Sequence, residues 1–136
     1  MTCFWKGIIT ALGNDRIKKV LGTKMGHQKK INVVKFVQSL KKNNTITDDV
    51  LCEDMELNQQ LKQDNYKHVA NLDIKKINMG YDCSTCDPFL LLICQLFEIN
   101  IQHQFNGVTI DYTNKKVKNK SYKLNFGSDT GHFWSQ

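Results

Sequence analysis

The sequence lacks a long apolar segment. The longest apolar run covers residues 89–97 and is interrupted by Gln95, whereas a helix that crosses a bilayer needs about 20 apolar residues. The start of the chain also lacks a charged segment followed by an apolar one, so we expect no signal peptide. These absences argue against a membrane protein and favour a location in the cytoplasm.

The sequence also lacks the even, regularly spaced cysteines of a disulfide scaffold. Its five cysteines are scattered, which favours a cytoplasmic chain with reduced thiols. One Cys-x-x-Cys motif is present, at Cys83 and Cys86, and with Cys94 and His103 it could be interpreted as a zinc site. No second paired motif follows, and Cys94 falls within an apolar helix. A thioredoxin-like interpretation lacks the required strand-then-helix context. We therefore expect no metal and no cofactor.

Acidic residues are fewer than basic ones, at 13 against 19, which leaves a net charge of +6 and a pI near 9.1. Dispersed lysines on amphipathic segments are typical of a solvated surface, but they also suit nucleic acid or an acidic partner. The densest cluster, residues 115–120, falls in an expected hairpin loop and lacks interleaved aromatic residues that would stack on bases.

The composition is that of a single globular domain over residues 1–136, with 40% hydrophobic and 24% charged residues. Apolar residues at helical spacing predict helices over residues 3–12, 15–21, 31–42, 48–62 and 89–97, with a short one near 69–74. Alternating patterns predict strands over residues 99–105, 108–113, 121–126 and 131–134. We therefore predict an α+β fold in which a helical N-terminal part precedes a small antiparallel sheet.

Local signals mark three of these boundaries. Thr47, followed by two acidic residues, is typical of a helix start. Residues 84–88 combine capping side chains, an early acid and a proline in the first helical turn. Asn106-Gly107 predicts a two-residue hairpin, because both residues accept a positive φ.

Cys3 and His132 stand out as a candidate catalytic pair. Cys3 opens the first expected helix, and His132 lies in the last expected strand. A thiol becomes a nucleophile when it ionises, and helix N-terminal N–H groups and a nearby imidazolium both lower its pKa. His132 would accept the thiol proton and later protonate the leaving amine. The backbone N–H groups of Cys3 and Thr2 would then bind the oxyanion.

The other histidines carry less weight as a general base. His27 and His68 lie in polar surroundings and are expected at the surface. His103 falls on the apolar face of its strand, which is typical of a hydrogen-bonded core histidine.

Three stretches carry a family resemblance. They are Cys3-Phe4-Trp5, residues 89–101 and Gly131-His132-Phe133-Trp134. In this order they resemble the ovarian-tumour (OTU) cysteine proteases, especially the compact viral members. The resemblance implies a papain-like architecture with Cys3 as nucleophile and His132 as general base. It implies ubiquitin or a ubiquitin-like protein as partner, or the parent viral polyprotein as substrate, in the host cytoplasm.

The resemblance also implies a substrate slot, but two family features are missing. Trp5 and Trp134 would wall a slot for a Gly-Gly tail, beside Gly131. Only two residues precede Cys3, in place of the family's Asp-Gly-Asn-Cys run, and Trp134 stands where many members have Asp or Asn. The site is then a thiol–imidazole dyad, or Asp129, expected in the turn before the strand, is its third residue.

A second function remains open. The chain could be a non-catalytic module whose basic surface binds RNA or an acidic protein. Reaction of Cys3 with a ubiquitin C-terminal electrophile would separate the two functions.

Overall fold

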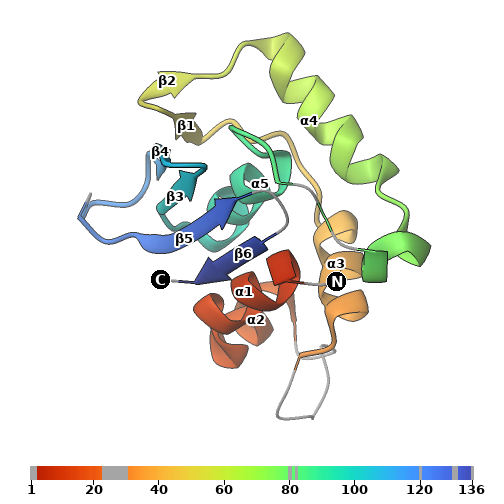
Figure 1. Cartoon of the computed structure of the whole chain (residues 1–136). Helices are drawn as coiled ribbons and strands as arrows, with labels where there is room; N and C mark the ends of the chain where they lie inside the picture. The colour runs from red at the N-terminus through yellow and green to blue at the C-terminus, as the bar shows by residue number, and fades with distance from the viewer. Residues whose placement is uncertain are drawn as a thin grey trace.

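A six-stranded mixed sheet, ordered β2-β1-β4-β3-β5-β6, packs against helices (Figure 1). The structure, a computed structural model, describes residues 3–22, 31–79, 81, 83–119, 121–129 and 132–135; of residues 3, 78–79, 129 and 132–135 it describes the backbone alone. The helices are α1 (Cys3–Leu12), α2 (Asn14–Leu21), α3 (Val33–Lys42), α4 (Gln59–Asn71), the 3-10 helix η2 (Ile74–Met79) and α5 (Pro88–Phe97). The strands are β1 (Val50–Cys52), β2 (Met55–Glu56), β3 (Ile101–Phe105), β4 (Val108–Asn114), β5 (Leu124–Asp129) and β6 (His132–Ser135). The predicted α+β class is confirmed.

The sheet is not purely antiparallel as predicted. Strands β3 and β4 form the expected hairpin, with positive φ at Asn106 and Gly107. Strand β4 also pairs with β1, so both of its edges are occupied. The next strand, β5, therefore pairs with the free edge of β3. The two strands run parallel, and their register begins with the pair Ile101 and Leu124. Strand β6 then pairs antiparallel with β5 at the edge of the sheet.

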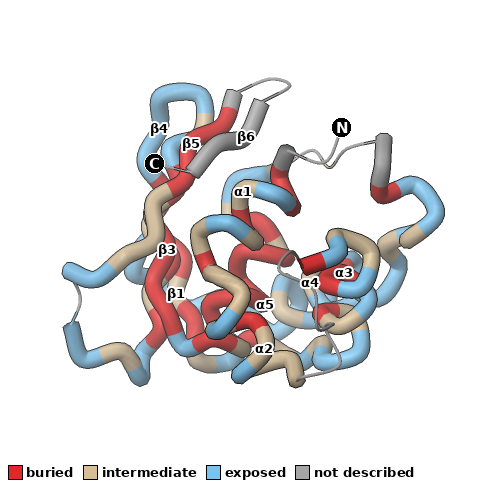
Figure 2. The backbone as a smooth tube through the Cα atoms, turned by 90° about the horizontal axis from the view of Figure 1, so that it is seen from below, coloured by how far each residue is buried: buried red, intermediate tan, exposed pale blue. Residues whose placement is uncertain are grey.

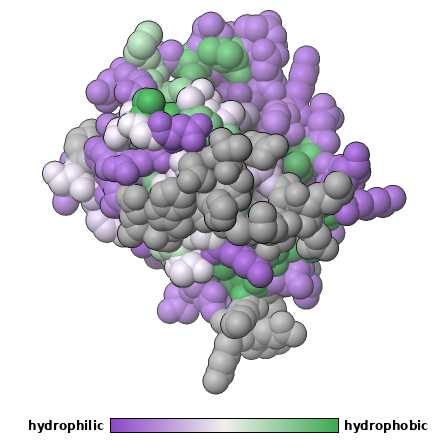
Figure 3. Space-filling model, in the orientation of Figure 1, coloured by the Kyte–Doolittle hydropathy of each residue, from purple (hydrophilic) through white to green (hydrophobic). Residues whose placement is uncertain are grey.

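The helix predicted over residues 48–62 is wrong in its first half. Residues 50–52 and 55–56 form β1 and β2, joined by a turn with positive φ at Glu53 and Asp54. Helix α4 begins only after Asn58, whose side chain accepts a hydrogen bond from the Leu61 N–H. It continues to Asn71, so the short helix expected near 69–74 is also wrong in its bounds. Figure 3 shows hydrophilic side chains over α4.

Helix α5 forms the centre of the core, as its all-round apolar sequence predicts. Residues 89–94 and Phe97 are buried, and Figure 2 shows buried backbone where α5 meets the neighbouring strands. Asp87 caps the helix by accepting a hydrogen bond from the Phe89 N–H, and Pro88 occupies the first turn. No helix in the described ranges is long and apolar enough to cross a membrane.

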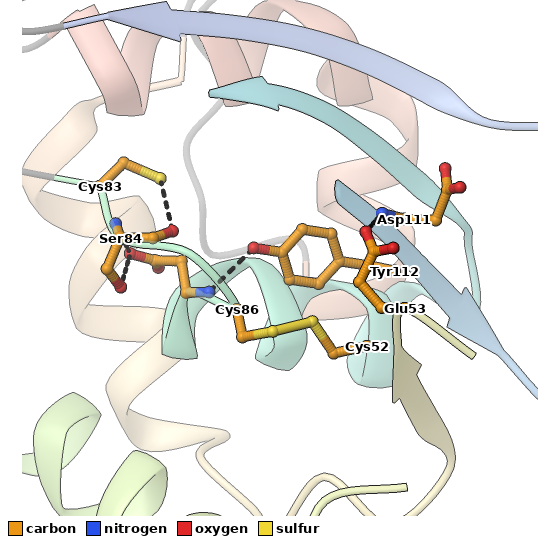
Figure 4. The surroundings of a disulfide bond; sticks show 8 residues. Cys52, Glu53, Cys83, Ser84, Cys86, Asp111 and Tyr112 are labelled. Atoms are coloured by element: carbon orange, nitrogen blue, oxygen red, sulfur yellow. Dashed lines mark hydrogen bonds between the residues drawn. A yellow bond between two sulfur atoms is a disulfide. The ribbon is translucent and has the colours of Figure 1, made fainter. Parts of the chain in front are cut away.

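A disulfide bond joins Cys52 of β1 to Cys86, just before α5 (Figure 4). The expectation that all cysteines are reduced is therefore wrong for this pair. With Cys86 bonded to Cys52, the Cys83-x-x-Cys86 motif does not supply two zinc ligands. Among the residues that the structure describes, no three potential metal ligands of the His, Cys, Asp and Glu types group together.

We expect loss of the disulfide to destabilise the fold. The bond joins residues separated by 34 positions, and closing such a loop restricts the unfolded chain. Double replacement Cys52→Ser/Cys86→Ser should lower the free energy of unfolding by roughly 2–4 kcal/mol in urea titrations. Cys83→Ser is the matched control, with little expected change. Equal stability of the native protein with and without dithiothreitol would contradict the prediction.

Candidate active site

The first helix and the last strand lie side by side. Helix α1 begins at Cys3 and packs against β6, which begins at His132 (Figures 1 and 2). These two elements come from opposite ends of the chain, and the structure brings together the backbone segments that carry the predicted pair. The side chains of Cys3 and His132 lie outside the described part, as do Thr2, Gly131 and the Trp134 side chain.

Asp129 lies elsewhere than the sequence indicated. It is the last residue of β5, not part of the preceding turn, and it is the direct cross-strand partner of His132. Directly opposed residues in an antiparallel pair have closely spaced Cβ atoms and interact through their side chains. This register places an acidic residue next to the candidate base along the backbone.

Aromatic packing holds the start of α1 in place. The Phe4 and Trp5 rings pack against Tyr81, with centroid distances of 4.7 and 5.4 Å, and Trp5 meets Phe89 edge-on at 5.0 Å. Trp5 is only 1% exposed. Trp5 lies three residues before the buried Ile8, so both side chains are on the inward face of α1. The structure thus places Trp5 in the core, which corrects its predicted role as a wall of a substrate slot.

Tyr81 links this aromatic cluster to a buried carboxyl group. Its hydroxyl donates a hydrogen bond to Asp87 Oδ2 at 2.9 Å and lies 3.1 Å from Nε2 of His68. His68 is exposed, as predicted. Asp87 also accepts bonds from the N–H and hydroxyl of Ser84. Burial raises the pKa of Asp87, while these donors act in the opposite direction. The sequence predicted residues 84–88 only as a helix start, and the contacts of Tyr81 and His68 depend on tertiary packing that no local pattern indicates.

Removing the Tyr81 hydroxyl should destabilise the protein without disturbing ring packing. Tyr81→Phe keeps the aromatic contacts but deprives the buried Asp87 of one donor. We expect the free energy of unfolding to fall by about 1–2 kcal/mol in urea titrations. Tyr66→Phe, on an exposed side chain, is the matched control. Equal stability of the two variants would show that the Tyr81–Asp87 bond contributes nothing.

His103 is a core histidine, as predicted. It is fully buried on β3, and its Nε2 lies 2.6 Å from the Ser128 hydroxyl on the paired strand β5. Burial lowers its pKa from 6.5 to about 4, because desolvation disfavours the imidazolium. His103 therefore stays neutral at physiological pH and contributes to packing rather than to a candidate site.

This lowered pKa predicts an acid-sensitive fold. The unfolded chain binds a proton at His103 near pH 6.5, whereas the folded protein binds it only near pH 4. The stabilisation is therefore complete above pH 6.5, is lost progressively below it and levels off near pH 4, amounting to about 3 kcal/mol at most. Unfolding free energies measured from about pH 7 to pH 5 should decline in the native protein and in His68→Gln. An equal decline in His103→Gln would contradict the assignment.

The other described thiols are not activated. Burial raises the pKa of both Cys83 and Cys94, and the Asp87 carboxyl raises that of Cys83 further. Cys52 and Cys86 are joined to each other. Cys3 is therefore the cysteine left as the candidate nucleophile, because two of the others form a disulfide and two have a raised thiol pKa.

Comparison of the chain with protein-family models, with curated proteins and with solved structures finds no match in any of the three.

Proposed function

We propose that this chain is a thiol peptidase or isopeptidase with Cys3 as nucleophile and His132 as general base. The observation that carries the proposal is the packing of α1 against β6, which brings together the backbone elements of both residues. The order of elements resembles that of the OTU cysteine proteases, with a buried helix that leads into the sheet and a final strand at His132. The raised pKa of the other free thiols supports Cys3 in this role.

The chemistry follows from these positions. His132 removes the Cys3 proton, and the thiolate attacks the scissile carbonyl carbon. The backbone N–H groups of Cys3 and Thr2 bind the oxyanion. When the tetrahedral intermediate collapses, the carbon–nitrogen bond breaks and His132 gives its proton to the leaving amine. Water, deprotonated by His132, then hydrolyses the thioester and restores the thiol.

Asp129 is the proposed partner of His132. A carboxylate beside the imidazole would hold its tautomer and stabilise the imidazolium. The cross-strand register supports Asp129 for this task. Trp134, two residues after His132, offers no carboxylate or amide for it.

The proposed substrates are ubiquitin-like conjugates or the parent viral polyprotein, cut next to small residues. Gly131 lets a substrate backbone approach closely because it has no side chain.

The proposed location is the host cytoplasm. Disulfides persist mainly in oxidising surroundings, so alkylation of free thiols in freshly lysed producing cells would show whether Cys52–Cys86 is closed there.

A ubiquitin C-terminal electrophile tests the proposal. The native protein and Cys83→Ala should each gain one covalent adduct in intact-mass measurements, and Cys3→Ala should gain none. A matching panel of ubiquitin-like electrophiles and polyprotein peptides identifies the substrate class. An adduct that persists in Cys3→Ala, or native protein inert toward the whole panel, would refute the proposal.

A further inference from the structure

Positive charge is concentrated at one end of the sequence. Residues 1–42 contain ten Lys and Arg residues and a single acidic residue, Asp15, whereas residues 43–136 contain nine basic and twelve acidic residues. The first segment therefore has a formal charge of +9 and the second has −3. The net charge of the protein conceals this division.

Four of the nine lysines in the second segment pair with neighbouring carboxylates in the described structure. Lys62 pairs with Asp48 at 3.0 Å, and Lys123 pairs with Asp111 at 3.2 Å. Two lysines of the cluster at residues 115–120, the densest in the sequence, also pair with carboxylates. Its Lys115 pairs with Glu56, and its Lys116 lies 3.4 Å from Asp49 and 3.7 Å from Glu98. Carboxylates thus weaken the positive field around Lys115 and Lys116.

The helical lysines have no such partners. Within the described residues, none of the following takes part in an ion pair: Lys6 on α1, Lys18 and Lys19 on α2, and Lys35 and Lys42 on α3. Four of them are exposed and Lys18 is half-buried. Helix α1 packs against both α2 and α3, so the three helices form one end of the molecule (Figure 1). We call these five lysines the helical basic face.

The helical basic face offers charge without apolar anchors. The aromatic side chains of its helices, Phe4, Trp5 and Phe36, are at most 2% exposed. The large exposed apolar side chains of the described residues lie on other parts of the chain, at Met55, Leu61, Tyr66, Val108 and Tyr122. Tyr122 is the described exposed ring known to border these helices, since Arg16 of α2 donates a hydrogen bond to its hydroxyl at 3.0 Å. One ring does not form the series of stacking platforms that single-stranded bases require, and the three helices expose no described aromatic side chain that would enter a membrane interface.

We propose that the helical basic face binds double-stranded nucleic acid through its phosphates, without reading the bases. A duplex presents a regular line of phosphates, and lysines spread over three helices can contact several of them at once. Released counterions drive such binding, so affinity falls steeply with salt. This activity does not require Cys3 chemistry and stands independently of the proposed peptidase function.

Fluorescence anisotropy with a labelled duplex of about 20 base pairs tests the proposal. The native protein should bind saturably at low salt, and log K should fall against log [salt] with a slope of about −3 to −4 if four of the five lysines make contacts. The triple variant Lys18→Gln/Lys19→Gln/Lys35→Gln should bind at least about tenfold more weakly and reduce the slope by two units or more. The matched control, Lys115→Gln/Lys116→Gln/Lys123→Gln, removes the same charge from paired positions and should stay within about threefold of the native affinity.

The outcomes separate the alternatives. Circular dichroism and thermal melts establish that both triple variants are folded before binding is compared. If the two triple variants weaken duplex binding equally, net charge alone determines the affinity, and the assignment of the binding site to α1–α3 is wrong. Absence of saturable binding would overturn the proposal. So would a clear preference for anionic lipid vesicles, or for an acidic protein such as polyglutamate, over the duplex at equal salt.

Discussion

Replacing Cys3 by alanine should abolish hydrolysis of a ubiquitin C-terminal amide, and His132→Ala should cost nearly as much. We expect each to lower kcat/KM by at least roughly 10³-fold, because members of one catalytic unit act together and removing either disables it. Neither change removes a described core contact, so both variants should melt within a few degrees of the native protein. Cys94→Ala is not a suitable control because that thiol is buried in α5; Cys83→Ala is, and should keep nearly full activity.

The Asp129→Asn variant then distinguishes a triad from a dyad. Because Asp129 is paired with His132 across the β5–β6 ladder, we expect a loss of tenfold or more in kcat/KM. A loss as large as that of His132→Ala would indicate a full triad. A change of less than about twofold in kcat/KM would indicate a thiol–imidazole dyad. The pairing of Asp129 with His132 would then serve the sheet and not catalysis. Appreciable turnover by folded Cys3→Ala would eliminate the proposed nucleophile altogether.

Trp5→Ala should cause the largest loss of stability among the single changes considered. Trp5 is nearly fully buried between Phe4, Tyr81 and Phe89, so truncation removes its apolar contacts and leaves a cavity. We expect the free energy of unfolding to fall by roughly 3–5 kcal/mol, measured in urea. Such a loss is a large share of the stability of a small domain.

Two companion variants keep this measurement informative. Trp5→Phe retains most of the ring volume and should cost clearly less, which gives a readable value if Trp5→Ala does not fold. Lys6→Ala, on the exposed side of the same helix, should change stability by no more than about 0.5 kcal/mol. If Trp5→Ala were as stable as Lys6→Ala and only its KM for substrate rose, Trp5 would be part of a substrate slot after all.

The sequence by itself determined the local elements of this protein. The apolar run at residues 89–97 predicted a buried helix, since no face of it could be exposed without cost. Asn106-Gly107 predicted the β3–β4 hairpin, because both residues tolerate the positive φ that the turn needs. The helical spacing of apolar residues within residues 3–12 predicted α1. Each of these follows from neighbours within a few positions.

The tertiary structure alone decided the features that depend on distant partners. Residues 50–52 became a strand because β4 offers an edge more than 50 residues along the chain, a pairing that local propensity does not reveal. The pairing of β5 with β3 follows from the occupied edges of β4, and the disulfide depends on the fold that brings Cys52 to Cys86. The pairing of charged side chains also depends on distant partners. Lys115 and Lys116, in the densest cluster of the sequence, are paired in space, whereas the five lysines of the helical basic face have no ion pair among the described residues. The reason is that the position of each carboxylate depends on how the whole chain folds.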